Sequence, residues 1–443
     1  MRVRLRRFWD NLNSGFWFFP AVLLAASALL AVLTLRLDEN YFEGRQPSID
    51  FLWTGDADGA RELLATVAAS IITVAGVVFS ILIVALALAS QQFGPRLLRN
   101  FTRDRGNQLS LGVFIGTFLY CLLVLRTVRH GPGETSFVPN LSVTTAIVLT
   151  TTSLGVLIYF IHHVATAIQA ENVVAAVGRD LDAAIRLYFP DSARTHRNET
   201  CDADGFDFST AAPVPARRTG YLQAIDTQAL IRLAEQHDLL VRATRRPGHF
   251  ITEGAPVAWV CPAAKCTPGL AQAVCDTLMV GNQRTATHDI EYSIYQLVEV
   301  AVRSMSAGIN DPFTAIACVD WLGAAIVQIA HRSFPPACRY DGQGRLRLIL
   351  NMVDFEGIVN AALDQIREVA RDDVAVSLRI LEVLATIAGQ APTSEQRRIL
   401  LKHARMVRAQ CETAFPEEHD RAAARERYEA VLRAAGENNR PPG

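Results

Sequence analysis

The sequence predicts a mainly α-helical integral membrane protein, in which four transmembrane helices are followed by a mixed α/β, mostly helical cytosolic domain. The chain has 443 residues and is 50% hydrophobic, and its apolar excess lies in residues 1–165. Residues 63–90 contain no charged side chain, a stretch long enough to cross a bilayer. The connectors between apolar segments change from acidic to basic, as expected for loops on opposite sides of a membrane.

The first predicted span follows an arginine-rich start. Residues 1–15 contain four arginines, and aromatic residues 16–19 lead into an apolar run that ends near Leu35. A signal peptide has an apolar region of only about 7–15 residues, so we expect a retained span. Residues 38–62 then hold seven acidic residues against two arginines. This acidic loop is expected outside the cell.

The second span is unusually long. Its 28 uncharged residues would form a helix of about 42 Å, whereas a hydrocarbon core measures about 30 Å, so the helix must tilt or project. Small and polar residues recur along it at steps mostly of three or four, which places them on one face. We call this set the small-polar stripe: Thr66, Ser70, Thr73, Gly76, Ser80, Ala87 and Gln91. Such a stripe should face protein or water rather than lipid.

The next connector, residues 91–108, is basic. It holds Arg96, Arg99, Arg103 and Arg105 with the single acid Asp104. The positive-inside rule places it in the cytoplasm, where the arginines would anchor the chain at anionic lipid. Alternatively, they would form an anion-attracting vestibule at the inner mouth of the second span.

Two further spans complete the membrane domain. The third runs from Leu109 to about Leu125, and its Gly112 and Gly116 have the Gly-x-x-x-Gly spacing that lets another helix approach closely. The fourth covers residues 141–161 and ends at His162 and His163, which would anchor the helix at the interface or sense pH. Four spans in a bacterial inner (plasma) membrane place both termini in the cytoplasm.

Beyond the spans we expect four segments. Helical periodicity continues through residues 166–190 as a stalk on the fourth span until Pro190, and residues 191–218 resemble a linker. Strand-like runs make residues 219–265 a small β-rich subdomain, similar to barrel-sandwich domains but without their modifiable lysine. Residues 266–443 are expected to be mostly helical, with one hairpin near 339–350.

Composition excludes several kinds of chemistry. Lys265 and Lys402 are the only lysines, so no Walker A motif is present, and neither a His-Glu-x-x-His nor a Gly-x-Ser-x-Gly motif occurs. We therefore expect neither an enzyme nor a cofactor. The net charge of -1 does not favour a nucleic-acid partner.

The cysteines give no metal site. The spacing of Cys261, Cys266 and Cys275, with His288 as a fourth candidate ligand, does not match paired Cys-x-x-Cys geometry, so no metal is expected. The eight cysteines do not form a dense, regular frame, and we expect reduced thiols in a cytosolic domain.

One soluble stretch stands out, residues 281–314. If its polar residues Arg284, Asp289, Arg303, Asn310 and Asp311 converge, they would bind a small ligand or form a subunit interface. The alternative is a capped helix-turn-helix, because Asp311 followed by Pro312 is a good helix start.

Three motifs carry a family resemblance. They are Ser90-Gln91-Gln92-Phe93-Gly94-Pro95-Arg96, Leu111-Gly112-Val113-Phe114-Ile115-Gly116-Thr117-Phe118 and Gly308-Ile309-Asn310-Asp311-Pro312-Phe313-Thr314. With them the chain resembles the bacterial predicted membrane-protein family called domain of unknown function 2254. The resemblance implies an integral membrane protein and assigns no activity or functional residue.

Two functions are consistent with this sequence. In the first, a homo-oligomer forms a channel whose second spans line a pathway and whose cytosolic domain gates or assembles it. The same stripe would also serve ordinary helix packing. In the second, the spans anchor a sensor or scaffold whose cytosolic domain binds a ligand or a protein partner.

Overall fold

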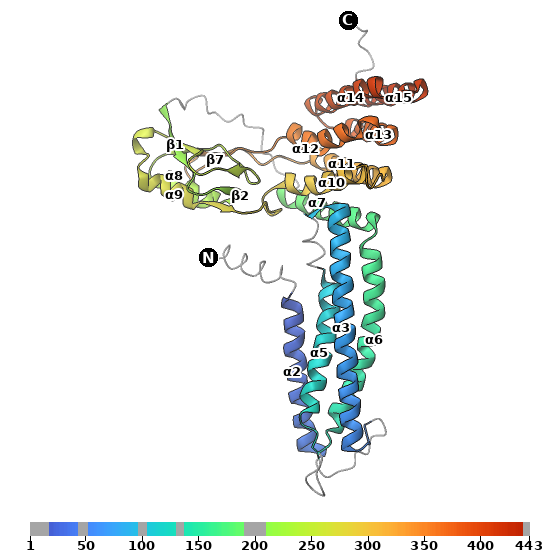
Figure 1. Ribbon diagram of the computed structural model, residues 1–443. Coiled ribbons are helices and arrows are strands. Elements are labelled where there is room, and N and C mark those ends of the chain that lie inside the picture. The colour runs from blue at the N-terminus through green and yellow to red at the C-terminus, as the bar shows by residue number, and fades with distance from the viewer. Residues whose placement is uncertain (1–16, 43–51, 96–103, 130–136, 190–209, 437–443) are drawn as a thin grey trace. The chain divides into compact units, whose positions relative to one another are not determined.

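The computed structural model describes residues 17–42, 52–95, 104–129, 137–189 and 210–436 (Figure 1). The chain divides into two compact units, Met1–Asn172 and Val173–Gly443. Most of the predicted linker, residues 191–218, and the arginines Arg96, Arg99 and Arg103 lie outside the described residues.

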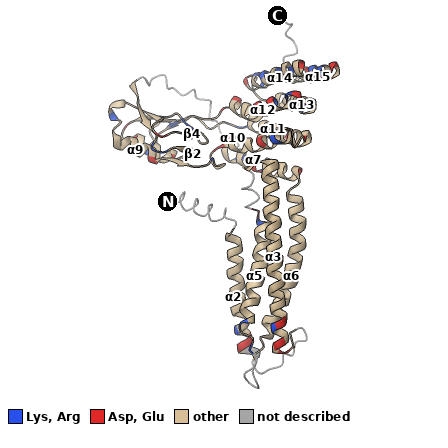
Figure 2. Ribbon diagram, in the orientation of Figure 1, with Lys and Arg blue, Asp and Glu red and all other residues tan. Residues whose placement is uncertain are grey.

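In its described residues, the first unit is a bundle of four long helices. They are α2 (Phe18–Leu37), α3 (Ala57–Phe93), α5 (Arg105–Leu125) and α6 (Asn140–Ala167). A short π-helix, η1 (Asp38–Phe42), follows α2. The described Lys, Arg, Asp and Glu residues of this unit gather near the ends of the helices and leave the middle uncharged (Figure 2). This distribution suits helices that cross a hydrocarbon layer.

Helix α5 contacts the other three helices of the bundle. Two of its glycines explain the close approach of α2. A Cβ atom on Gly112 would lie 2.5 Å from Leu23 Cδ1, and one on Gly116 would lie 2.5 Å from Ser27 Oγ. The prediction from the Gly-x-x-x-Gly spacing is therefore confirmed, with α2 as the partner helix.

Polar side chains join α2, α5 and α6 at one end of the bundle. Asp38, only 2% exposed, accepts hydrogen bonds from the backbone amides of Leu141 and Ser142 at 2.9 Å, and from Ser142 Oγ at 2.7 Å. It therefore caps the start of α6 from about 100 residues away. Beside it, the Tyr120 hydroxyl donates to the Ser142 carbonyl and lies 2.9 Å from Thr34 Oγ1. This network gives these polar groups hydrogen-bond partners, which lipid could not supply.

The fourth span does not continue as the predicted stalk. Helix α6 ends at Ala167, and a separate helix, α7 (Ala170–Tyr188), begins three residues later. At the break, the Asn172 side-chain amide donates to the Thr166 carbonyl, which also accepts from the backbone amide of Gln169. From Val173 onward α7 belongs to the second unit, where Gly178 allows close contact with the Trp321 ring.

The second unit begins with a mixed α/β part. A five-stranded sheet has the order β1-β5-β3-β8-β7, and a three-stranded sheet has the order β4-β2-β6. The strands are β1 (Ala212–Pro215), β2 (Gly220–Ile225), β3 (Leu240–Ala243), β4 (Phe250–Ile251), β5 (Pro256–Cys261), β6 (Leu278–Gly281), β7 (Cys338–Tyr340) and β8 (Leu346–Ile349). Helices α8 (Thr227–Gln236) and α9 (Pro268–Asp276) share their core. The predicted β-rich subdomain thus extends beyond residues 219–265 and includes two helices.

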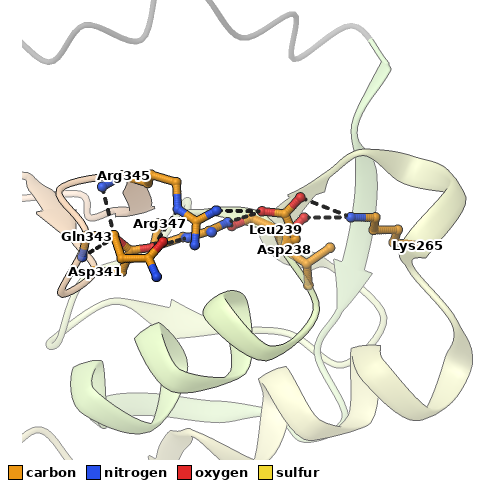
Figure 3. Close-up of polar contacts among 7 residues, drawn as sticks. All are labelled: Asp238, Leu239, Lys265, Asp341, Gln343, Arg345 and Arg347. Atoms are coloured by element: carbon orange, nitrogen blue, oxygen red, sulfur yellow. Dashed lines mark hydrogen bonds and ion pairs between the residues drawn. The ribbon is translucent and has the colours of Figure 1, made fainter.

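The predicted hairpin near 339–350 is present as β7 and β8, and it joins the five-stranded sheet because β8 pairs in parallel with β3. An ion-pair network holds it there (Figure 3). Arg347, 5% exposed at its side chain, donates from Nε to Asp341 and from NH1 to Asp238, both at 2.8 Å. Lys265 reaches the other side of Asp238.

Six α-helices follow in the described part of the second unit. They are α10 (Ile290–Ser304), α11 (Pro312–Ala330), α12 (Phe355–Val369), α13 (Val374–Gln390), α14 (Ser394–Ala414) and α15 (Glu418–Ala435). Successive pairs stack in three layers (Figure 1), joined by contacts of α11 with α13 and of α13 with α15. The predominance of helix after residue 266 agrees with the sequence expectation.

Among the described residues, five helices are long and apolar enough to cross a membrane: those of residues 18–40, α3, α5, α6 and α11. The fifth, α11, was not expected as a span. It contacts α10, α12 and α13 in the second unit, and its Asp320 pairs with Arg379 of α13 at 2.6 Å. Its apolar composition therefore serves a helix core within that unit.

Candidate functional site

Helix α3 has two contrasting faces. Its packing face recurs every three or four residues and is buried: Ala57, Ala60, Leu64, Ala68, Ile71, Ala75, Val78, Leu82, Ala85, Ala89 and Phe93. All seven residues of the small-polar stripe are instead exposed. At 3.6 residues per turn the two sets lie on opposite sides of the helix. The described residues therefore leave the stripe uncovered.

The stripe combines small, hydroxyl and apolar side chains. Thr73 Oγ1 donates to the Ala69 carbonyl at 2.8 Å, so this hydroxyl is satisfied within the helix. A Cβ atom on Gly76 would meet nothing within 4 Å. Val77 and Val84 fall on the same face and are also exposed, so polar and apolar rows alternate along it.

Of the four connector arginines, the structure describes Arg105. It begins α5, and its guanidinium lies 5.8 Å from the centre of the Phe19 ring. The neighbouring Asp104 caps α5 through the amide of Asn107 and lies 2.7 Å from His163 Nε2. The carboxylate thus ties the start of α5 to the end of α6.

The five candidate residues of 281–314 do not form one cluster, because they lie at the two ends of α10. Arg284 donates to both oxygens of Asp289, at 2.7 and 3.0 Å, and Asp289 caps α10 through the amide of Tyr292. Burial alone would lower the pKa of the Arg284 guanidinium, but the paired Asp289 raises that pKa above its usual value.

At the other end of α10, each residue has a local role. Arg303 pairs with Glu299 one turn earlier at 3.3 Å. Asn310 has a φ of 49°, a left-handed conformation that asparagine tolerates. Asp311 caps α11 through the amide and hydroxyl of Thr314. This geometry is that of a capped helix-turn-helix.

The Arg284–Asp289 pair requires a glycine beside it. Gly248 has a φ of 94°, and a Cβ atom there would lie 2.3 Å from Asp289 Oδ2. Glycine is the residue that combines this backbone conformation with so close an approach. The turn at residues 246–249 is thereby brought against the start of α10.

This turn borders a cavity of about 200 Å³ in the second unit. Residues from the end of α7, the start of α8, the start of α10 and strands β7 and β8 with their flanking segments line it. They are Tyr188, Phe189, Ile225, Thr227, Arg246, Pro247, His288, Asp289, Ile290, Glu291, Pro335, Arg339, Leu350, Asn351, Met352 and Val353.

Both carboxylates on the cavity wall have partners. Asp289 is paired with Arg284, and Glu291 accepts from Arg246 at 2.8 and 3.2 Å. Arg246 also donates to Asn351 at 3.4 Å. Burial lowers the pKa of His288 and that of Arg339. The sequence offered no signal for the Arg246–Glu291 pair, whose two residues lie 45 positions apart in the chain, or for the place of Arg339 in the same cavity.

The described cysteines do not assemble a metal site. No group of three or more His, Cys, Asp or Glu side chains among the described residues could hold an ion. Cys261, Cys266 and Cys275 are free, and burial raises the pKa of the Cys266 and Cys275 thiols. Cys338 is disulfide-bonded, so the expectation that all thiols are reduced is wrong at this residue.

The apolar helices and the second unit define a membrane protein with several apolar helices and a mixed α/β, mostly helical part. The chain belongs to the family described as predicted membrane protein, domain of unknown function 2254, whose model matches residues 13–386. This confirms the resemblance seen in the motifs.

Curated relatives carry no described activity. Uncharacterised proteins of Mycobacterium bovis and Mycobacterium tuberculosis are 30% identical to the chain over 436 residues, which cover 95% of this chain and 81% of theirs. No solved structure matches the chain.

Proposed function

We propose that the protein forms an oligomeric channel in a bacterial inner membrane, in which the α3 helices of neighbouring copies line a polar pathway. The observation that carries this proposal is the exposure of all seven stripe residues on the side of α3 opposite its packing face. A face of small and polar residues that the described part of the chain leaves uncovered allows another copy to pack closely or water to line it.

The proposed pathway is uncharged. Its lining would alternate between hydroxyl rows, such as Thr73 and Ser80, and rings of Val77 and Val84. Hydrophobic constrictions of this kind can close a pore by excluding water. The proposal therefore includes a gate at the valine rings, with the second unit assembling the oligomer or acting on that gate.

Planar bilayers containing the purified protein test the proposal directly. We expect single-channel conductance under voltage, tension or a pH change. Thiol reagents applied from the aqueous phase should block Thr73→Cys and Ser80→Cys, which lie on the stripe. The matched controls Ile72→Cys and Phe79→Cys, also exposed but off the stripe, should conduct unchanged.

Two results would contradict the pathway. The first is the absence of conductance under all three stimuli. The second is equal modification of stripe and control positions, which would indicate that α3 faces lipid on all of its exposed sides.

A further inference from the structure

Half of the residues that line the cavity beside the start of α10 are apolar. They are Phe189, Ile225, Pro247, Ile290, Pro335, Leu350, Met352 and Val353. Its volume of about 200 Å³ is small for a drug-sized ligand, for which pockets usually measure about 300–1,000 Å³. An engineered apolar cavity of about 150 Å³ holds benzene, so a single small ring or a short chain suits this space.

The cavity also contains polar groups without partners. The Arg339 side chain is about half-buried on β7 and makes no hydrogen bond or ion pair with the described residues, and both wall carboxylates are paired with other arginines. The Tyr188 hydroxyl is buried and has no hydrogen-bond partner among the described residues. A buried donor without an acceptor is costly, so both groups favour an incoming acceptor.

Helices α8 and α10 begin at the cavity wall, at Thr227 and Ile290. The amino ends of helices carry partial positive charge, and here the carboxylates of Asp226 and Asp289 already cap them. The preference of the cavity for an anion therefore rests on Arg339, because both wall carboxylates pair with other arginines.

We propose that this cavity binds a small monocarboxylate with an apolar body, whose carboxylate pairs with Arg339 and accepts a hydrogen bond from Tyr188. One planar guanidinium matches a carboxylate through two parallel hydrogen bonds. Phosphate sites typically gather several cations, and the described wall has only one unmatched arginine. This inference does not depend on the pathway proposed for α3.

Binding of benzoate to the full-length protein in detergent tests the inference, measured by calorimetry or by ligand-observed NMR. Benzyl alcohol has the same ring without the charge, and inorganic phosphate has the charge without the ring. We expect benzoate to bind and both comparison compounds to bind at least about tenfold more weakly.

Variants of the cavity residues test whether benzoate binds in this cavity. Arg339→Gln should weaken benzoate binding about tenfold to a hundredfold, the usual effect of losing a hydrogen bond to a charged group. Tyr188→Phe, which keeps the ring, should weaken it by a smaller factor. Arg303→Gln, at a partly exposed arginine at the far end of α10, is the matched control and should bind as the wild type does.

Three outcomes would overturn the proposal: no benzoate binding by the wild type at millimolar concentration, equal binding of benzyl alcohol, or unchanged binding by both Arg339→Gln and Tyr188→Phe. Thermal unfolding of each variant separates loss of binding from loss of folding. If Arg339→Gln does not fold, Tyr188→Phe decides the question.

Discussion

Asp341 organises the β7–β8 hairpin with one side chain. Its carboxylate accepts from the amides of Gln343 and Arg345 and from Nε of Arg345 and Arg347 (Figure 3). The Arg347 hydrogen bond, followed by the Arg345 amide, lowers the pKa of Asp341 to about 2. The charged form is therefore the one that the fold stabilises.

This pKa predicts an acid-dependent contribution to stability. Because the folded pKa lies below the ordinary value of about 3.9, Asp341 stabilises the fold fully above pH 4 and loses its contribution as the pH falls towards 2. Thermal unfolding of wild type and Asp341→Asn should differ most at neutral pH and converge near pH 2. A difference that stays constant from pH 6 to pH 2 would contradict this role.

A second residue-scale prediction concerns Gly248. Replacing it by alanine should destabilise the second unit by about 1–3 kcal/mol, because the new Cβ would meet Asp289 in a left-handed backbone conformation. Gly269→Ala is the control, since Gly269 lies in α9 with nothing within 4 Å of its Cβ position. Alanine favours helix there, so denaturant unfolding should show no loss. Equal effects of the two substitutions would contradict the proposed clash between the new Cβ and Asp289.

At the scale of elements, the start of α6 depends on α2. The cap that α6 needs comes from Asp38, beyond the end of α2, because the residue before α6 is Pro139, which makes no side-chain cap. Both oxygens of Asp38 accept hydrogen bonds in a buried setting.

The substitution Asp38→Asn tests this cap. Asparagine accepts through only one oxygen and places an amide donor against other donors, so we expect a loss of about 1–3 kcal/mol. Asp56→Asn is the matched control. Asp56 is exposed and caps α3 through a single bond to Gly59, a role that asparagine fills equally well. Thermal unfolding in detergent should separate the two variants, and similar midpoints would contradict the cap.

Helix α3 shows what sequence can predict at this scale. Its uncharged length placed a helix at residues 63–90, and the structure extends it to Ala57–Phe93. The sequence could not tell which side packs inward, because alanines such as Ala68 and Ala75 on the packing face are as small as the stripe residues. The side chains of the two faces are of similar size, so only the packing of the folded helices distinguishes one face from the other.

At the scale of the whole molecule, the number of spans decides on which side of the membrane the end of the chain lies. We expect four, because α11 packs among α10, α12 and α13 and carries the Asp320–Arg379 pair. Alkaline phosphatase fused after Ser304 and after Ala435 should therefore report the same side of the membrane. Opposite sides would make α11 a fifth span.

The same fusions test orientation. The basic connector predicts that both lie in the cytoplasm, with inactive phosphatase, while a fusion after Arg126 should be active. The disulfide at Cys338 is of a kind uncommon in the reducing cytosol. If the fusions after Ser304 and Ala435 are both active, the orientation predicted from the arginines is wrong. The disulfide would then lie outside the cytoplasm, in an oxidising compartment where disulfides normally form.

Much of the local structure could be predicted, and little of the long-range pairing. Strand β2, the hairpin and the caps at Asp226, Asp289 and Asp311 follow from neighbouring residues. The parallel pairing of β3 with β8 joins segments about 100 residues apart, which no local pattern encodes. The cavity was missed for the same reason, because Tyr188, Arg246 and Arg339 meet only after folding.

The cap at Asp38 also sets an order of assembly during synthesis. Its partner Ser142 follows 104 residues later in the chain. At about 5–20 residues per second, a ribosome needs roughly 5–20 seconds to make that stretch. During this interval the first span is already made while its carboxylate has no amides to bind. We therefore expect Asp38 to stay hydrated at the membrane surface until the fourth span is made and its first amides bind the carboxylate.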